Sequence, residues 1–212
     1  VMSQANERLL ADPEYMASIN EDLREEGLEY KGTANPKHLL WIIAEDLGID
    51  FLESKVVNKL QGIKLAPFYG CYIVRPSKAL GFEENPGRKQ ALEEIIETVG
   101  GEVVDFPGKT LCCGFPILTI NPENSVNMVA NHTIDAKDRG ADAMVTPCPL
   151  CHLNLDGYQP NAASARKREI DLPIIHLPQL LGLALGISPE KMRLNKHIVS
   201  TKKLLSELVI SP

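Results

Sequence analysis

Five cysteines are the residues of this 212-residue chain whose types and spacing point most directly to chemistry. They occur as a single thiol, a vicinal pair and a Cys-Pro-Leu-Cys motif: Cys71, Cys112, Cys113, Cys148 and Cys151. Thiolates are soft donors that select iron–sulfur clusters, zinc or copper(I) over oxygen-preferring cations. A chain of this length needs no disulfide staples, so the adjacency and the two-residue gap indicate a metal or redox centre.

The cysteine spacing favours polynuclear iron over two alternatives. Tetrahedral zinc would use four thiols and leave a fifth over, and structural zinc sites usually draw on two C-x2-C knuckles. The adjacent thiols of Cys112 and Cys113 cannot easily chelate one ion in a relaxed geometry, but they can reach different irons of an extended cluster. The third chemistry, thiol–disulfide exchange, is indicated only by the C-x2-C motif, which resembles a thioredoxin-type dithiol but comes here after a late strand.

Short apolar runs that alternate with helical patterns from residue 63 onward predict an α/β domain. The candidate strands span 64–69, 103–106, 143–146 and 173–176. The candidate helices span 88–99, 125–139, 177–186 and 201–208. Parallel neighbours need crossover connections of about this length, so we predict a mostly parallel sheet with helices on both faces. Three of the strands are followed by cysteines, and the carboxyl ends of parallel strands share one edge, so the five thiols are expected to converge there.

Residues 1–62 are predicted to form a helical N-terminal connector ahead of this domain. Within it, Pro36 is expected in the first turn of a helix capped by Asn35, and a further short helix is expected over 51–60. His38 and Trp41 are interpreted as packing residues. The resulting division is a connector over 1–62 and an α/β domain over 63–212.

Composition and charge exclude several classes of protein. The chain is 44% hydrophobic and 24% charged, which is typical of a globular protein, and its net charge of −6 argues against a nucleic-acid partner. No apolar stretch is long enough to span a membrane. The N-terminal residues show no pattern of a signal peptide, so a cytoplasmic protein is expected.

Three stretches around the cysteines carry a family resemblance. Gly70-Cys71, Leu111-Cys112-Cys113-Gly114 and residues 147–156 resemble the cysteine-rich CCG domain, and the whole chain is most similar to the B-type subunit of heterodisulfide reductase. Members of that family carry two CCG motifs, whereas this chain contains one, which looks like the second. The resemblance therefore implies that 1–62 is the remainder of a truncated N-terminal CCG domain and that 63–212 is the C-terminal CCG domain, which binds the iron–sulfur cluster.

The resemblance also implies a cofactor, a reaction and partners. In the family each motif holds a noncubane [4Fe-4S] cluster through five cysteine sulfurs, which would make all five cysteines of this chain ligands. The implied reaction is reduction, or the reverse oxidation, of a disulfide or thiol small molecule by electrons from a flavin-bearing A-type subunit and a ferredoxin-like C-type subunit. A chain with a single motif is expected to be inactive alone.

The five cysteines also allow two alternative functions, and four residues near them or in the C-terminal region have expected roles. The cluster could instead relay electrons in a lactate, glycerol-3-phosphate or succinate/fumarate oxidoreductase complex, or the thiols could hold zinc in an interaction module. His152 follows Cys151 and is the candidate catalytic residue, as a proton donor to a product thiol, although a histidine there is as often a helix-surface residue. Asn154 and Asp156 are expected to orient the cysteine loop, and His197 is expected to be structural or exposed.

Overall fold

A parallel β-sheet of four strands forms the centre of the protein. The structure is a computed structural model that describes residues 1–208, so the last four positions of the predicted second domain, 209–212, lie outside the described residues. The strands are β1 (Lys64–Pro67), β2 (Glu102–Val103), β3 (Ala143–Thr146) and β4 (Ile174–His176), in the order β2-β1-β3-β4. Pairing is parallel throughout, with Leu65 opposite both Val103 and Ala143. The predicted α/β fold class is confirmed.

Apolar side chains alternate between the two faces of this sheet and build two cores. Leu65 and Val145 point into one core, whereas their neighbours Ala66 and Met144 point into the other, because successive side chains of a strand face opposite sides. A strand that is buried on both faces must be apolar at nearly every position, and all four residues of β3 are buried. The sheet therefore needs helices on both sides.

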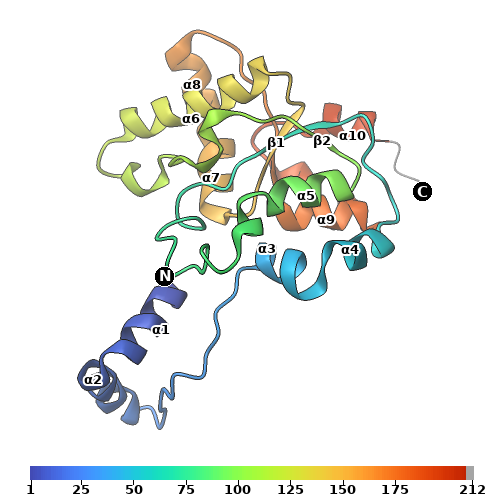
Figure 1. Ribbon diagram of the computed structural model, residues 1–212. Coiled ribbons are helices and arrows are strands. Elements are labelled where there is room, and N and C mark those ends of the chain that lie inside the picture. Colours follow the sequence, from blue (N-terminus) through green and yellow to red (C-terminus); the bar gives the residue numbers. More distant parts are fainter. Residues whose placement is uncertain (209–212) are drawn as a thin grey trace.

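Helices cover both faces as predicted (Figure 1). The helices packed around the first core are α3 (Leu39–Trp41), the π-helical turn η1 (Ile42–Leu47), α4 (Ile49–Lys55), α5 (Ala91–Thr98), α9 (Leu177–Ala184) and α10 (Lys202–Glu207). Those around the second core are α6 (Pro122–Asp138), α7 (Pro149–Gly157) and α8 (Gln159–Arg166). Short 3-10 turns lie between them: η2 (Pro86–Lys89), η3 (Pro107–Thr110), η4 (Phe115–Ile117) and η5 (Leu194–Lys196).

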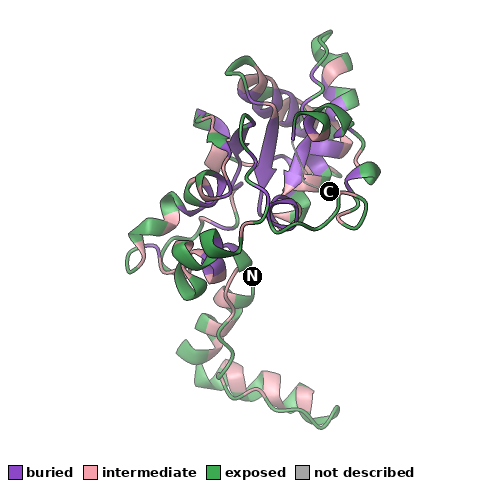
Figure 2. Ribbon diagram, turned by 90° about the vertical axis from the view of Figure 1, so that its right-hand side faces the viewer, coloured by how far each residue is buried: buried purple, intermediate pink, exposed green. Residues whose placement is uncertain are grey.

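Two N-terminal helices, α1 (Met2–Ala11) and α2 (Pro13–Arg24), project away from this body and have no buried residue (Figures 1 and 2). They are joined to the extended chain that follows them by local contacts. The Asn20 side chain bonds both backbone groups of Tyr30, and a Cβ at Gly32 would lie 2.5 Å from the Leu10 side chain. This arm is stabilised by its own contacts and not by the core.

The helical prediction for residues 1–62 is wrong in three places. Residues 28–38 form no helix, and the next helix begins at Leu39, where His38 Nδ1 accepts the Leu40 N–H (3.1 Å) in place of the expected Asn35–Pro36 start. Helix α4 ends at Lys55, because the N–H groups of Val57 and Asn58 donate to Ala184 O on α9. A local cap by His38 thus sets the start of α3, and tertiary hydrogen bonds set the end of α4.

The first two strands are shorter than predicted. β1 ends at Pro67, since the N–H groups of Tyr69 and Gly70 turn to donate to Lys109 O (2.8 and 3.2 Å) and leave the sheet. β2 is only two residues long. The chain that carries Cys71 is thereby fastened to the chain that leads to Cys112.

Among residues 1–208, no helix combines the length and the apolar character that crossing a membrane would require.

Candidate functional site

The cysteines lie where the strands of the sheet end. Cys71 comes shortly after β1, Cys148 caps the N-terminus of α7 after β3, and Cys151 lies in the first turn of that helix. Cys112 and Cys113 occupy the loop between η3 and η4. The elements that position the thiols are therefore those that the sequence predicted.

The fold brings the five thiols together in two adjoining groups. The Cys71 thiol hydrogen-bonds Cys112, and we call these two residues the outer pair. Cys151 hydrogen-bonds both Cys113 and Cys148, and these three form the inner trio. Electrostatic contact between Cys71 and Cys113 joins the two groups, and a Cβ at Gly70 would lie only 2.7 Å from Cys151 Sγ. All five cysteines are reduced.

Two members of the inner trio are the most enclosed thiols. Cys113 and Cys151 are 3% and 4% exposed and belong to the second core, whereas Cys148 and the outer pair are half-buried. Asn154 on α7 donates to Cys113 O (2.8 Å) and to Ser125 Oγ (3.3 Å), so it orients the cysteine loop as expected. Asp156 instead accepts the N–H groups of Ile198 and Val199 (2.8 and 3.1 Å), which fastens a C-terminal segment to α7.

Glycine is required at the position after the vicinal cysteines. Gly114 has a φ of +95°, and a Cβ there would lie 2.9 Å from Ser125 O and 3.0 Å from Ser125 Cα. The loop can therefore approach α6 only without a side chain at this residue. His132 on α6 bonds Cys112 O (2.9 Å) from the same side, so this loop is held from several directions.

Hydrogen bonding prepares two of the inner thiols to ionise. The Cys151 thiol and the backbone N–H groups at the start of α7 lower the pKa of Cys148 to about 6, and the same thiol lowers the pKa of Cys113. Hydrogen bonding with Cys113 and Cys148, together with burial, raises the pKa of Cys151. Burial and the neighbouring Cys112 raise the pKa of Cys71. Thiolates are the metal-binding form of cysteine, and the inner trio favours it at two positions.

The thiols contact one another directly. Within the described part of the chain, no group of three or more His, Cys, Asp or Glu side chains is arranged to hold a single metal ion.

Four histidines form a chain of rings behind Cys148 and Cys151, and only part of this arrangement was expected. His152 lies 4.8 Å from His197 and 6.0 Å from His176, between ring centroids. His176 Nε2 contacts Pro147 O (3.3 Å), and His38 also bonds this carbonyl, next to Cys148. His38, interpreted as a packing residue, also lies beside this carbonyl, and His197, expected to be structural or exposed, is half-buried against His152.

The histidine chain is kept neutral by its surroundings. Burial, and next the neighbouring His197, lowers the pKa of His152, and burial likewise lowers the pKa of His176. Among the described residues, His152 Nε2 and His197 Nδ1 are buried without a hydrogen-bond partner. The position of His152 directly after Cys151 was a sequence signal for this cluster, whereas nothing in the spacing links His38 or His197 to it.

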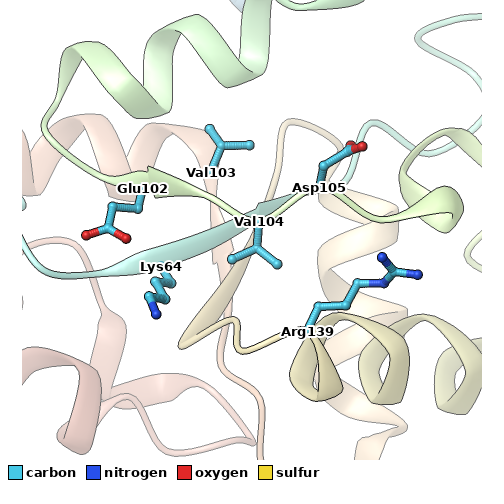
Figure 3. Close-up of a pocket in the computed structure, with 6 residues that line it drawn as sticks. All are labelled: Lys64, Glu102, Val103, Val104, Asp105 and Arg139. Atoms are coloured by element: carbon cyan, nitrogen blue, oxygen red, sulfur yellow. The ribbon is translucent and has the colours of Figure 1, made fainter.

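A separate pocket of about 450 Å³ lies away from the thiols, at β2 and the end of α6 (Figure 3). Its charged lining residues carry both signs, with Lys64 and Arg139 opposed by Glu102 and Asp105. It contains no cysteine or histidine, so it is not part of the thiol site.

Comparisons with known proteins agree with this architecture. The family described as "Cysteine-rich domain" (CCG) matches residues 65–156, which contain all five cysteines. A solved structure of a hypothetical protein from Helicobacter pylori has a TM-score of 0.71 at 17% identity, over 93% of this chain and 35% of that one, and shows the fold alone. The sheet with thiols gathered at its strand ends is thus a cysteine-rich CCG domain.

Two curated relatives identify the family more closely. The chain is 37% identical over 186 residues to the 8-methylmenaquinol:fumarate reductase membrane anchor subunit of Wolinella succinogenes, covering 88% of this chain and 64% of that protein. It is 32% identical over 212 residues to the B-type subunit of the ferredoxin/F(420)H(2)-dependent CoB-CoM heterodisulfide reductase of Methanosarcina acetivorans, covering 98% of this chain and 69% of that protein. The chain belongs to the family of heterodisulfide reductase B-type subunits and spans about two thirds of the length of these relatives.

Proposed function

We propose that the five thiols hold a noncubane [4Fe-4S] cluster and that the chain is the C-terminal cluster domain of a disulfide-reducing subunit. The mutual contacts of the five free cysteines, which come from three separate segments of the chain, support this proposal. The donor set fits the group, because it consists of soft sulfur ligands and includes a vicinal pair suited to more than one iron. Gly70 and Gly114 leave no room for side chains where the loops meet the thiols.

Bound at these thiols, the cluster would supply single electrons for breaking or forming a sulfur–sulfur bond. The protein's residues supply the setting. Asn154 fixes the Cys113 carbonyl, and burial shields Cys113 and Cys151 from water. His152, whose buried Nε2 has no partner in residues 1–208, is proposed to take up a proton and pass it from its imidazolium form to a product thiolate, a transfer that the lowered pKa of His152 favours.

In the proposed function, this chain works as one subunit of a larger complex. The relatives named as heterodisulfide reductase subunits support partners of that kind, and we propose a flavin-bearing A-type subunit and a ferredoxin-like C-type subunit. The substrate is a small disulfide or thiol. Because only one cysteine motif is present, the 212-residue chain alone is expected to bind a cluster without catalysing turnover.

A second candidate function is electron relay without a disulfide substrate. The relative named as the membrane anchor subunit of a fumarate reductase supports it. In that case the same five cysteines would hold the same cluster, and the cluster would pass electrons to another redox group instead of to a disulfide.

Anaerobic reconstitution with iron and sulfide tests the cluster. We expect about four irons and a similar amount of acid-labile sulfide per chain, and large losses of iron in the single Cys→Ala variants, Cys112→Ala included. Ser206→Ala, which removes an exposed hydroxyl on α10, should keep the iron. Full iron retention in Cys112→Ala contradicts the five-ligand proposal, and one zinc without sulfide supports the interaction module instead.

Electron paramagnetic resonance separates the two cluster functions. A signal of the oxidised cluster that changes when a thiol is added favours disulfide chemistry. A signal that is indifferent to thiols and disulfides favours relay.

A further inference from the structure

A closed ring of hydrogen bonds joins the chain segment that carries Cys71 to the segment that carries Cys112. The Tyr69 N–H donates to Lys109 O (2.8 Å), and the side chains of the same two residues both bond the carboxylate of Glu93 on α5. Lys109 Nζ lies 2.9 Å from Glu93 Oε1, and the Tyr69 hydroxyl donates to Glu93 Oε2. Tyr69, Lys109 and Glu93 are therefore linked in a cycle, which we call the Glu93 ring.

The Glu93 ring is largely shielded from solvent. Tyr69 is 1% exposed, and the side chain of Glu93 is 13% exposed. The Tyr69 hydroxyl also accepts the Leu92 N–H (2.9 Å), one of the donors that the first turn of α5 leaves without an intrahelical partner. Hydrogen bonds to a charged group are strong and costly to lose where water is scarce, so the ring fixes α5 against both cysteine segments.

Only a short length of chain separates the ring from the outer pair of thiols. Cys71 follows Tyr69 by two positions, and Cys112 follows Lys109 by three. Consecutive Cα atoms are about 3.8 Å apart, so each cysteine lies within about 12 Å of the ring along the chain. The Gly70 N–H adds a second bond to Lys109 O (3.2 Å). A shift between Tyr69 and Lys109 would therefore reach the contact between Cys71 and Cys112.

The inner trio is held by a different set of interactions. Asn154 on α7 donates to Cys113 O, and the second core packs around Cys113 and Cys151. The Glu93 ring and these anchors have no residue in common. The outer pair can therefore be disturbed while the inner trio stays in place.

We propose that Glu93 is a positioning residue for the outer pair: it sets the separation of the Cys71 and Cys112 thiols by holding Tyr69 and Lys109 together. The inference rests on the proposed function for the use of these two thiols as cluster ligands, and on the ring alone for their spacing. Two of the five proposed ligands thus depend on one carboxylate of a helix that contains no cysteine.

Cross-linking of the reduced, cluster-free chain with dibromobimane tests the spacing, because this reagent bridges two thiols that lie close together. Peptide mapping by mass spectrometry gives the yield of the Cys71–Cys112 bridge relative to bridges within the inner trio. In Glu93→Gln the side-chain amide has one acceptor atom, so it cannot accept from both Tyr69 and Lys109. We expect the relative yield of the outer bridge to fall at least about threefold.

Glu94→Gln is the matched control, because it removes the same charge from the next residue of α5, which is exposed. It should leave the yields of both kinds of bridge unchanged. Tyr69→Phe removes only the hydroxyl and should also lower the outer bridge. Since the ring acts as a unit, the double variant of Tyr69 and Glu93 should lower it by less than the product of the two single effects.

Two results would overturn the positioning role. One is an equal outer-bridge yield in Glu93→Gln and Glu94→Gln, and the other is a parallel fall of outer and inner bridges, which indicates general loosening. Near-UV circular dichroism verifies that each variant is folded. If Glu93→Gln does not fold, Tyr69→Phe provides the same comparison.

Iron content and electron paramagnetic resonance separate this inference from the proposed function. After anaerobic reconstitution, Glu93→Gln is expected to change the signal of the oxidised cluster, because two of the proposed ligands move. If the unmodified chain loads iron and Glu93→Gln alters neither the outer bridge nor this signal, the cluster stands and the positioning proposal fails. If Glu93→Gln lowers the outer bridge and neither protein assembles a cluster, the positioning role stands and the cluster proposal fails.

Discussion

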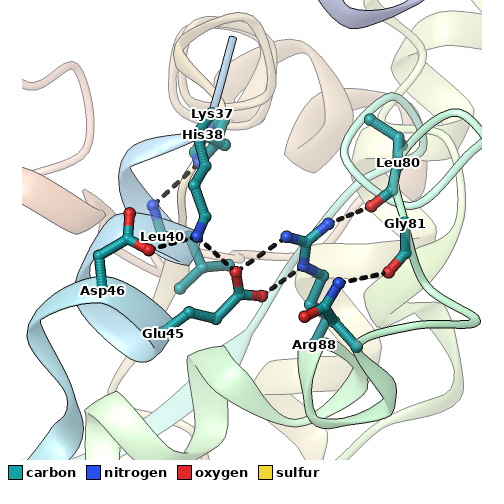
Figure 4. Close-up of polar contacts among 9 residues, drawn as sticks. Lys37, His38, Leu40, Glu45, Asp46, Leu80, Gly81 and Arg88 are labelled. Carbon is teal, nitrogen blue, oxygen red and sulfur yellow. Dashed lines mark hydrogen bonds and ion pairs between the residues drawn. The ribbon is translucent and has the colours of Figure 1, made fainter. Parts of the chain in front are cut away.

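The outer pair and the inner trio of cysteines are held by different kinds of interaction. The inner trio is held by buried, uncharged interactions. These are the packing of the second core and the hydrogen bonds that Asn154 donates to Cys113 O and Ser125 Oγ. The interactions that hold the outer pair lie nearer the surface and involve charged side chains. Arg75 donates to Thr110 O, and Arg88 pairs with Glu45 at the loop over residues 77–90 (Figure 4). The two halves of one site thus differ in how they respond to solvent.

The two kinds of anchor suggest different roles for the inner trio and the outer pair. Buried neutral hydrogen bonds cannot be screened by salt and are costly to break, so they suit a fixed ligand framework. The half-buried outer pair is the more accessible side of the site.

Gly114→Ala should have the largest effect. The added Cβ meets Ser125 O and Cα at 2.9 and 3.0 Å, and the φ of +95° strains any side chain, so we expect a loss of roughly 3 kcal/mol in the free energy of unfolding. Urea denaturation of the cluster-free protein measures it. Gly140→Ala is the matched control, because its φ is +90° with nothing within 4 Å of the added Cβ, and it should cost about 1 kcal/mol. Equal losses in the two variants would mean that the loop is not packed tightly against α6.

Asn154→Ala should have the next largest effect. The side chain is 1% exposed, and its removal leaves the buried Cys113 carbonyl without its donor, so a loss of about 2 kcal/mol is expected. Thermal and urea unfolding measure the loss, and iron content after reconstitution should fall with it. Asn131→Ala on α6, whose exposed side chain accepts from Arg166, should change stability little. A neutral Asn154→Ala would show that packing alone holds the inner trio.

The sequence predicted the parts of the fold that depend on local pattern. β3 begins and ends where its apolar run does, and the helices on both faces follow their apolar periodicity. The convergence of the five thiols was predictable because strand ends share an edge in a parallel sheet. That inference needed only the order of the elements, and no side-chain detail.

The features that were missed depend on contacts between residues far apart in the chain. His38 and His176 meet on one carbonyl, although the N-terminal segment and β4 are separated by most of the chain. Arg75 Nη1 donates to Thr110 O on another loop, and no spacing marks these two residues as neighbours. The early ends of β1 and α4 were set by carbonyls of other elements, Lys109 O and Ala184 O. Local patterns contain no information about such partners.

The smallest expected effect is on the outer side, where acid should loosen the Arg88–Glu45 anchor. The Arg88 guanidinium lowers the pKa of Glu45 to about 2 from its ordinary 4.5, so the stabilisation is complete above pH 4.5 and is lost as the pH falls toward 2. With allowance for solvent screening, Glu45→Gln should cost about 1 kcal/mol at pH 7, and its difference from the unmodified protein should vanish near pH 2. Urea unfolding at several pH values measures the difference in the free energy of unfolding, and amide hydrogen exchange of residues 77–90 shows whether this loop loses protection. Asp138→Asn breaks the comparable but fully exposed pair with Arg168 on the inner side and should leave that loop protected. A pH-independent difference for Glu45→Gln would show that the outer loop is held by packing, as the inner one is, and would remove the contrast between the two halves.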